Sequence, residues 1–253
     1  MAETITDKAE ARQALMAMVE GRTRIAVLAG AGLSTESGLP DFRSPGGIWS
    51  QFRPVTYQEF VADEDARLED WRRRFIMNEE FARAEPNDGH KALAGLARDG
   101  RLSILVTQNV DGLHRRAGTP QDVLVEIHGT ATHGHCLDCG RVMSIAAARQ
   151  AIETTQRAPR CETCGGLVKA AVVSFGQSMP EAALQRAAKA FAEADLAIVV
   201  GSALEVYPAA NLPRIAVAHG VPLVILNRTP TMLDDEADLL LRSPAAETLH
   251  GLL

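Results

Sequence analysis

The sequence has no apolar run long enough to cross a membrane. A spanning helix needs roughly 20 consecutive apolar residues, whereas the apolar runs here, such as Ile25–Ala29, are far shorter. The N-terminal stretch MAETITDKAEARQAL contains several acidic residues and no apolar core, which is not the pattern of a secretory signal. We therefore expect a cytoplasmic protein with no membrane partner, in a compartment where thiols stay reduced.

The sequence also lacks an excess of positive charge. Its 26 Lys and Arg residues against 32 Asp and Glu give a formal net charge of −6 at pH 7. Proteins held by nucleic-acid phosphates need basic surfaces, so this balance argues against a specific nucleic-acid partner. With 46% hydrophobic residues over 253 positions, the chain is long enough for one sizeable core and a smaller module.

A short β-branched run, Ile25–Ala29, breaks directly into Gly30-Ala31-Gly32. A buried strand that ends in a glycine-rich turn is the usual way for an α/β fold to bind a diphosphate. The dehydrogenase fingerprint fits badly, because Thr35 stands where its third glycine belongs and no acidic residue ends a second strand at the required distance. The series Asp41, Phe42 and Arg43 then predicts a loop that wraps around a ligand.

Apolar strands alternate with helical segments along the chain, which predicts an α/β fold with a Rossmann-like, doubly wound parallel sheet. The expected strands occupy residues 25–29, 102–107, 123–127, 196–200 and 223–226. The expected helices occupy residues 8–20, 59–84 (as one or two helices), 180–194, 208–219 and 244–253, with another beginning near residue 89.

Polar residues follow the ends of these strands. They are Gly30, Gln108, Asn109, Asp111, His128, Ser202 and Asn227. Because the carboxyl ends of parallel strands line one crevice, we expect these residues to converge on a ligand there.

Four cysteines form two Cys-x-x-Cys pairs, Cys136 with Cys139 and Cys161 with Cys164, separated by 21 residues. In a reducing compartment this spacing predicts one tetrahedral Zn²⁺ site per chain. Four thiolates leave no open coordination position for water, so the metal is expected to be structural. A nucleic-acid-binding zinc ribbon is the alternative, but the basic residues around the cysteines are sparse.

Taken together, these segments resemble the sirtuins, the NAD-dependent protein lysine deacylases, in a bacterial form. The resemblance is carried by GAGLSTESGLPDFRS at 30–44, EPNDGHKAL at 85–93, TQNVDGLHRRAG at 107–118, EIHG at 126–129, VVSFGQSMP at 172–180, GSALEVYPAA at 201–210, VILN at 224–227 and the cysteine pairs. It implies a discontinuous NAD-binding domain of residues 1–44, 86–130 and 168–253. A helical insertion at 45–85 and the zinc module at 131–167 would form a smaller domain, with the acylated lysine between the two.

The resemblance also implies that NAD binds as a co-substrate. Gly30, Ala31 and Gly32 would hold its diphosphate, and Thr35, Asp41, Phe42 and Arg43 would belong to a loop over the nicotinamide ribose. Gln108 and Asn109 would hold the ribose hydroxyls, with a catalytic role for Asn109, and Asp111 would bind the carboxamide. The remaining implied NAD contacts are Trp49, Val110, Gly201, Ser202, Ala203, Asn227, Arg228 and Ala245.

His128 is the expected general base, because it follows a strand whose neighbours also end in the crevice. The expected products are free lysine, nicotinamide and O-acetyl-ADP-ribose. The resemblance places a substrate peptide as an added strand between Val173, Phe175 and Gly176 on one side and Glu205, Val206 and Tyr207 on the other.

The chain departs from the family at a few positions. Gln177 stands where many members have Glu, and Ala203 where many have Ser. Residues 71–80 lack the Tyr of the subgroup that acts on acidic acyl groups, so an acetyl or another neutral acyl group is expected. Two alternatives stay open at this point: ADP-ribosyl transfer from the same NAD pocket, and a zinc-ribbon interaction module with a vestigial nucleotide fold.

Overall fold

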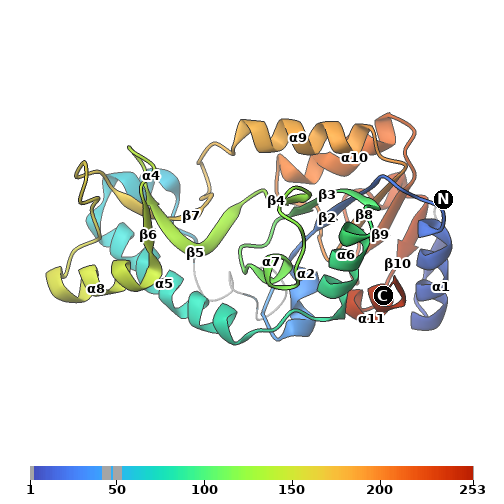
Figure 1. The fold of residues 1–253 in the computed structure, drawn as a ribbon, viewed down its shortest axis with the longest axis horizontal. Helices are drawn as coiled ribbons and strands as arrows, with labels where there is room; N and C mark the ends of the chain where they lie inside the picture. The colour runs from blue at the N-terminus through green and yellow to red at the C-terminus, as the bar shows by residue number, and fades with distance from the viewer. Residues whose placement is uncertain (1–2, 42–46, 48–52, 253) are drawn as a thin grey trace.

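The computed structural model describes residues 3–41, 47 and 53–252, and it contains a parallel sheet of seven strands in the order β1-β10-β9-β8-β2-β3-β4 (Figure 1). The strands are β1 (Glu3–Ile5), β2 (Ile25–Ala29), β3 (Leu102–Thr107), β4 (Leu124–Glu126), β8 (Leu196–Val200), β9 (Leu223–Leu226) and β10 (Leu239–Leu241). The chain winds outward from β2 through β3 to β4, and then from β8 through β9 to β10. The strand order reverses between β2 and β8, where open α/β sheets bind ligands. The predicted doubly wound sheet is confirmed.

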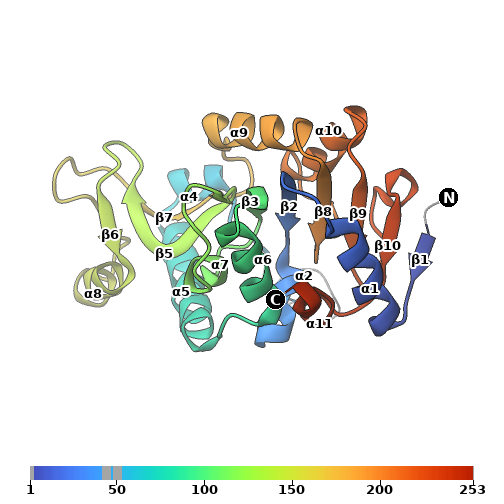
Figure 2. The ribbon, with the colours of Figure 1, turned by 45° about the vertical axis from the view of Figure 1, so that its right-hand side comes forward.

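Helices cover both faces of this sheet (Figures 1 and 2). One face carries α1 (Lys8–Val19), α6 (Asp88–Arg98) and α11 (Ala245–Leu249), and the other carries α9 (Glu181–Ala192) and α10 (Leu212–Ala218).

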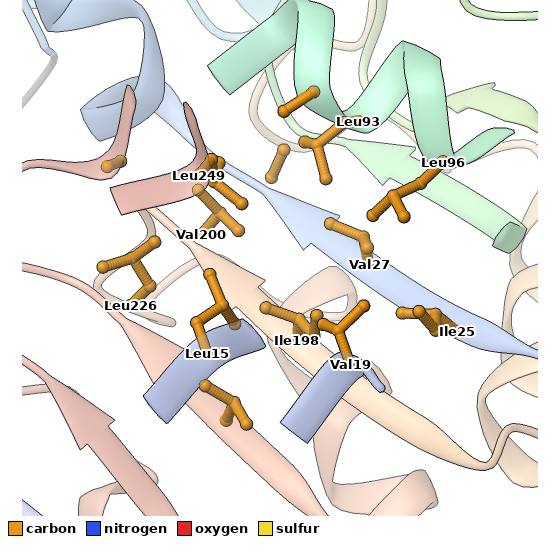
Figure 3. Packing of buried hydrophobic residues seen from close by; sticks show 14 of the residues in the cluster. Leu15, Val19, Ile25, Val27, Leu93, Leu96, Ile198, Val200, Leu226 and Leu249 are labelled. Carbon is orange, nitrogen blue, oxygen red and sulfur yellow. The ribbon is translucent and has the colours of Figure 1, made fainter. Parts of the chain in front are cut away.

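Side chains of β2 alternate between the two layers. Ile25 and Val27 pack in the cluster with α1 and α6, whereas Ala26 and Leu28 pack in the cluster with α9 and α10. Figure 3 shows the first cluster, in which Leu15 of α1 and Leu93 of α6 reach toward the strands. The apolar run of β2 is continuous because both of its faces are buried.

Two strands of the sheet were not predicted from the sequence. β1 and β10 have three residues each, too few to show a strand pattern. They pair with each other, and β10 pairs with β9, at the edge of the sheet farthest from β4.

Several helix boundaries also differ from the prediction. Asp63 caps the second of two consecutive helices, α4 (Tyr57–Ala62) and α5 (Glu64–Arg83). Pro180 is the N-cap residue of α9 rather than its first residue, and Pro213 lies in the first turn of α10, which follows a 3₁₀ turn at Ala209–Asn211. Proline fits these starts because the first helical amides have no partner inside the helix.

A second, antiparallel sheet lies at the other end of the molecule, on the left of Figure 1. It has the order β6-β5-β7, formed by β5 (Gly129–Cys136), β6 (Val142–Ser144) and β7 (Val168–Val172). Helices α5 and α8 (Ile145–Thr155) pack on it around Trp71, which donates a hydrogen bond from Nε1 to the Val168 carbonyl (3.2 Å). β5 begins directly after His128, so this sheet starts where the expected base lies.

The remaining regular segments are short and connect the larger ones. They are α2 (Ala31–Ser34), α7 (Leu113–Arg116) and the 3₁₀ turns Thr35–Ser37, Asp234–Glu236 and His250–Leu252. None of the helices in the described part of the chain combines the length and apolar character needed to span a bilayer.

Candidate active site

The glycine turn after β2 packs backbone against backbone on the end of β8. The Gly30 amide donates to the Val200 carbonyl and the Gly32 amide to the Gly201 carbonyl, both at 2.8 Å. A Cβ on Gly30 would lie 2.6 Å from the Gly201 oxygen, and one on Gly201 would lie 2.3 Å from the Leu33 nitrogen. Gly201 also has φ +62°, which favours glycine. These glycines therefore let the two halves of the sheet meet closely at the switch point.

A buried network joins the turn after β2 to the segment after β3. Asn109 Nδ2 donates to the Gly30 carbonyl and to Ser34 Oγ, each at 3.1 Å. Ser34 Oγ in turn donates to Asp111 Oδ2 (2.8 Å), and the Leu113 amide donates to Asp111 Oδ1 (2.9 Å). Asn109 and Asp111 are thus held in fixed orientations by residues that lie far away in the sequence.

Asp111 borders a small pocket whose apolar walls include Leu39, Pro40, Phe81 and Val110. Burial raises the pKa of the Asp111 carboxyl, against the hydrogen bonds from the Leu113 amide and Ser34. Ser34, Asn109 and Asp111 form the polar side of this otherwise apolar pocket.

A larger cavity of about 390 Å³ lies elsewhere, among Arg12, Asn87 and His250. Its lining charges are of mixed sign, and Lys8 and His250 pair there with Glu247 (2.6 Å) and Asp88 (3.2 Å). We place the site at the strand ends because that is where the predicted polar residues meet.

Gln108 links the segment after β3 to the end of β8. Ser202 Oγ donates to Gln108 Oε1 at 2.8 Å, and the Leu204 amide donates to Ser202 Oγ at 3.3 Å. Gln108 Nε2 is buried and has no hydrogen-bond partner among the described residues. A buried donor of this kind fits a ligand oxygen, as a ribose hydroxyl would supply.

His128 lies at the junction of the two sheets. Its Nδ1 lies 3.0 Å from the Gln108 carbonyl oxygen, and its own carbonyl accepts from the Val173 amide at 2.8 Å. Because a carbonyl oxygen only accepts, Nδ1 carries the proton of a neutral ring and Nε2 carries the lone pair. The next residue, Gly129, has φ +77°, and a Cβ there would lie 2.0 Å from the Ala171 oxygen. Glycine therefore lets β7 approach His128.

The predicted peptide-binding segments flank this junction. Residues 173–176 continue from the end of β7, where the Tyr57 amide of α4 donates to the Phe175 carbonyl (2.9 Å) and Gln58 Nε2 donates to the Gly176 carbonyl (3.1 Å). Phe175 is 44% exposed and Tyr207, on the other segment, is 52% exposed. Glu205 is exposed and Val206 half-buried.

The other predicted NAD contacts are spread along the sheet edge. Thr35 Oγ1 donates to the Gly32 carbonyl (2.9 Å), and Asn227, at the end of β9, donates from Nδ2 to the Thr229 carbonyl (2.9 Å). Ala203 is half-buried, Arg228 exposed, and Ala245 is buried at the start of α11. Asp41 lies at the edge of the described chain, and Phe42, Arg43 and Trp49 lie outside the described residues.

The four cysteines meet at the far end of the small sheet. Their sulfur atoms all lie within 4.8 Å of one another, and the described part of the chain contains no other His, Cys or acidic group of this kind. Each pair is followed by a glycine with positive φ, Gly140 (+73°) and Gly165 (+74°), whose amide donates to the carbonyl of the first cysteine. Backbone amides of Cys164 and then Thr163 lower the pKa of Cys161 to about 6, which favours the thiolate. The cluster fits the predicted structural Zn²⁺ site.

Sequence reasoning did not single out Ser34, Leu39 or Phe81. Ser34 is the hub between Asn109 and Asp111, while Leu39 and Phe81 form pocket walls. Ser34 and Leu39 belong to the glycine-rich stretch at 30–44, so their motif was a usable signal. Phe81 was an ordinary apolar position of α5, and its sequence gave no sign of its place beside the pocket.

Comparison with known proteins agrees with this geometry. A family model described as "Sir2 family" matches residues 30–208. The chain belongs to the Sir2 family. A Rhodopseudomonas palustris relative named NAD-dependent protein deacetylase is 47% identical over 232 residues, which cover 92% of each chain. A Thermus thermophilus relative named NAD-dependent protein deacylase is 42% identical over 250 residues, 96% of this chain and 93% of the relative.

Solved Sir2 structures share the fold. Sir2Tm bound to a propionylated peptide superposes with a TM-score of 0.83 at 32% identity, covering 94% of both chains. A Sir2 complex with p53 peptide and NAD⁺ gives a TM-score of 0.81 at 33% identity, covering 94% of this chain and 95% of that one. The predicted family, fold class and use of NAD are confirmed.

Proposed function

We infer that this Sir2-family protein is an NAD-dependent protein lysine deacylase that releases nicotinamide and transfers the acyl group to ADP-ribose. The observation that carries the inference is the convergence of Asn109, Asp111 and Gln108 with His128 at the switch point of the sheet. The relatives named as deacetylases and deacylases align over nearly their whole length, so the inference concerns the complete catalytic unit.

NAD supplies the sugar carbon to which the acyl oxygen bonds as nicotinamide leaves. We propose that Asp111 accepts the carboxamide in the pocket beside Phe81, and that Gln108 Nε2 donates to a ribose hydroxyl. Asn109 would orient the ribose and a water molecule from its place against Gly30 and Ser34. Side chains that are fixed before binding need little reorganisation in the transition state.

The proposed role of His128 is to take a proton from the ribose diol at Nε2. Its Nδ1 contact with Gln108 supports this role by leaving Nε2 as the basic nitrogen. The hydroxyl oxygen activated in this way attacks the acyl carbon, and the lysine amine leaves with a proton. The acyl carbon is then bonded to two sugar oxygens, and water adds to it as its bond to the first of these oxygens breaks. The products are the free lysine and an O-acylated ADP-ribose.

We propose that the substrate is an acylated lysine in a peptide segment lying between residues 173–176 and 205–207. The exposed Phe175 and Tyr207 on the two sides support this placement. Main-chain pairing would supply affinity with little sequence selectivity. We expect the lysine to carry an acetyl or another neutral acyl group, because residues 71–80 lack the Tyr of the subgroup that acts on acidic acyl groups.

We further propose that residues 1–44, 86–130 and 168–253 act as the NAD-binding lobe, and 45–85 with 131–167 as the smaller lobe. Separate hydrophobic clusters support the division. Two of them cover the two faces of the large sheet, and a third surrounds Trp71 and Cys136. Strand β5 runs across the boundary near residue 130, and β7, which begins at residue 168, pairs with it from the other lobe.

Incubation of the protein with an acetyl-lysine peptide and NAD, followed by mass spectrometry, tests the function. The expected result is loss of acetyl from the peptide with an equal amount of nicotinamide. A gain of ADP-ribose mass on protein, without deacetylation, would assign ADP-ribosyl transfer instead. The absence of NAD turnover with a panel of acylated peptides would overturn both enzymatic assignments.

A further inference from the structure

One lysine is buried completely in the second, antiparallel sheet. Lys169, in the middle region of β7, has 0% exposure. Its ammonium donates to the Val172 carbonyl and, at 3.4 Å, to the Ala170 carbonyl. The Phe60 ring of α4 lies 5.9 Å from Nζ. A buried ammonium is costly and is retained only where nearby acceptors compensate it.

The acceptors are available because β5 and β7 pair irregularly. Gly129 pairs with Val172 and Gly134 with Ala170, so six β5 positions lie opposite three β7 positions. The extra β5 residues bulge away and cannot bond regularly to the end of β7. Lys169 reaches along its own strand and donates to the Val172 carbonyl.

The Val172 carbonyl belongs to the same peptide group as the Val173 amide. That amide donates to the His128 carbonyl at 2.8 Å. A line of hydrogen bonds therefore runs from Lys169 through one peptide group to the main chain of His128. The same peptide group is the start of the segment 173–176.

We propose that Lys169 is a positioning residue that fixes the peptide-binding segment 173–176 against His128. The inference rests on the proposed deacylase function, because that function assigns substrate binding to this segment. Two polarised hydrogen bonds on one peptide group strengthen each other and restrict its rotation. Without the ammonium, the first residue of the segment would lose its fixed orientation toward the base.

The surroundings of Lys169 disfavour its charged form. Burial and then Arg74 lower the pKa of Lys169 to about 8, while Asp70 opposes them. Asp70 is itself paired with Arg74 at 3.3 Å. His135 of β5 lies opposite Lys169 in the register. An apolar side chain of equal length would avoid the cost of burying a charge. We therefore assign the role of the Lys169 ammonium to its hydrogen bond with the Val172 carbonyl.

Three substitutions and a control test the inference. Lys169→Met and Lys169→Gln remove the charge, Lys169→Arg retains it, and Lys189→Met makes the same change on an exposed lysine of α9. The KM for an acetyl-lysine peptide is measured at saturating NAD, and the KM for NAD at saturating peptide. Melting temperature is measured for every variant.

Lys169→Met is expected to raise the peptide KM about tenfold, the equivalent of one hydrogen bond to a charged group. The KM for NAD should stay within about twofold, because the contacts of Lys169 among the described residues are with Val172, Ala170 and Phe60, outside the proposed NAD site. Lys169→Gln should behave similarly, Lys169→Arg should recover part of the loss, and Lys189→Met should match the wild type.

Unchanged peptide KM in folded Lys169→Met or Lys169→Gln would overturn the inference. Equal losses for peptide and NAD, with a lower melting temperature, would also overturn it, as would unfolding of both uncharged variants, since these results describe a structural lysine. A wild-type protein that does not deacylate the peptide would instead refute the proposed function. The two failures are therefore distinguishable.

Discussion

The imidazole of His128 is held by the main chain of Gln108, with 3.0 Å between Nδ1 and the carbonyl oxygen. The side-chain oxygen of the same glutamine accepts a hydrogen bond from Ser202 Oγ, which lies just after β8. One residue thus fixes the tautomer of the base and also presents a buried amide donor to the ligand space. In the proposed mechanism, this one backbone position at the end of β3 would align the base with the ribose.

Replacing His128 by Ala should lower deacylation at least about 10²-fold, the usual contribution of a general base. Binding of NAD should persist, because the proposed contacts of Gln108, Asn109 and Asp111 are retained. Nicotinamide release and calorimetric NAD binding measure the two effects. His219→Ala, at an exposed histidine after α10, is the matched control. An unchanged turnover rate would remove His128 from the mechanism.

Replacing Gly201 by Ala should destabilise the switch point more than the same change at Gly220. Both glycines have positive φ, +62° and +74°, so both variants incur similar backbone strain. Only Gly201 would bring a Cβ to 2.3 Å from the Leu33 nitrogen, whereas nothing lies within 4 Å at Gly220. We expect an additional loss of roughly 1–3 kcal/mol in unfolding free energy for the Gly201 variant. Urea denaturation measures the unfolding free energy of both variants. Equal losses for the Gly201 and Gly220 variants would contradict the close contact at Gly201.

The protein should lose stability as pH falls from 7 to 5. His90 and His114 are buried with ring centroids 4.8 Å apart. Burial lowers the pKa of His90 to about 4, and burial followed by His90 keeps the pKa of His114 well below its ordinary value. The unfolded chain therefore binds protons below about pH 6.5 that the folded chain does not bind. For His90 alone the loss at pH 5 is about 2 kcal/mol.

Urea midpoints between pH 7.5 and 5 measure this loss. The window lies above the range in which most carboxylates titrate, so buried histidines dominate it. His250→Gln, at an exposed histidine, is the control and should follow the wild type. A flat stability profile across the window would show that the pair is accessible to protons in the folded state.

Removal of the metal should unfold the smaller lobe. The protein is expected to contain one zinc per chain, and chelation should lower its melting temperature. Cys136→Ser should reduce soluble yield and stability more than it reduces the specific activity of the molecules that fold, because Cys136 is buried in the core with Trp71. Metal analysis and thermal melting test this expectation. A stable, fully active Cys136→Ser protein would contradict a structural role.

The site could be predicted where local pattern and topology agree. β2 and β3 are buried on both faces, so their apolar runs are continuous and their polar ends stand out, as at Gln108 and Asn109. Lys169 could not be predicted, because a lysine in a strand is usually exposed and its burial depends on the irregular pairing with β5. His90 and His114 meet only through the packing of α6 on α7.

Strands β5 and β7 have the cysteine cluster at one end of the pair and His128 at the other. At one end Cys136 pairs with Val168 beside the thiolate cluster, and at the other Gly129 pairs with Val172 next to the base. The register places four residue steps of β7 between these ends, a separation of roughly 13 Å, so one short pair of strands joins the cysteine cluster to His128. Oxidation of the cysteines is therefore expected to disturb the proposed peptide-binding segment 173–176, which continues from β7, before it disturbs the proposed NAD contacts on the large sheet.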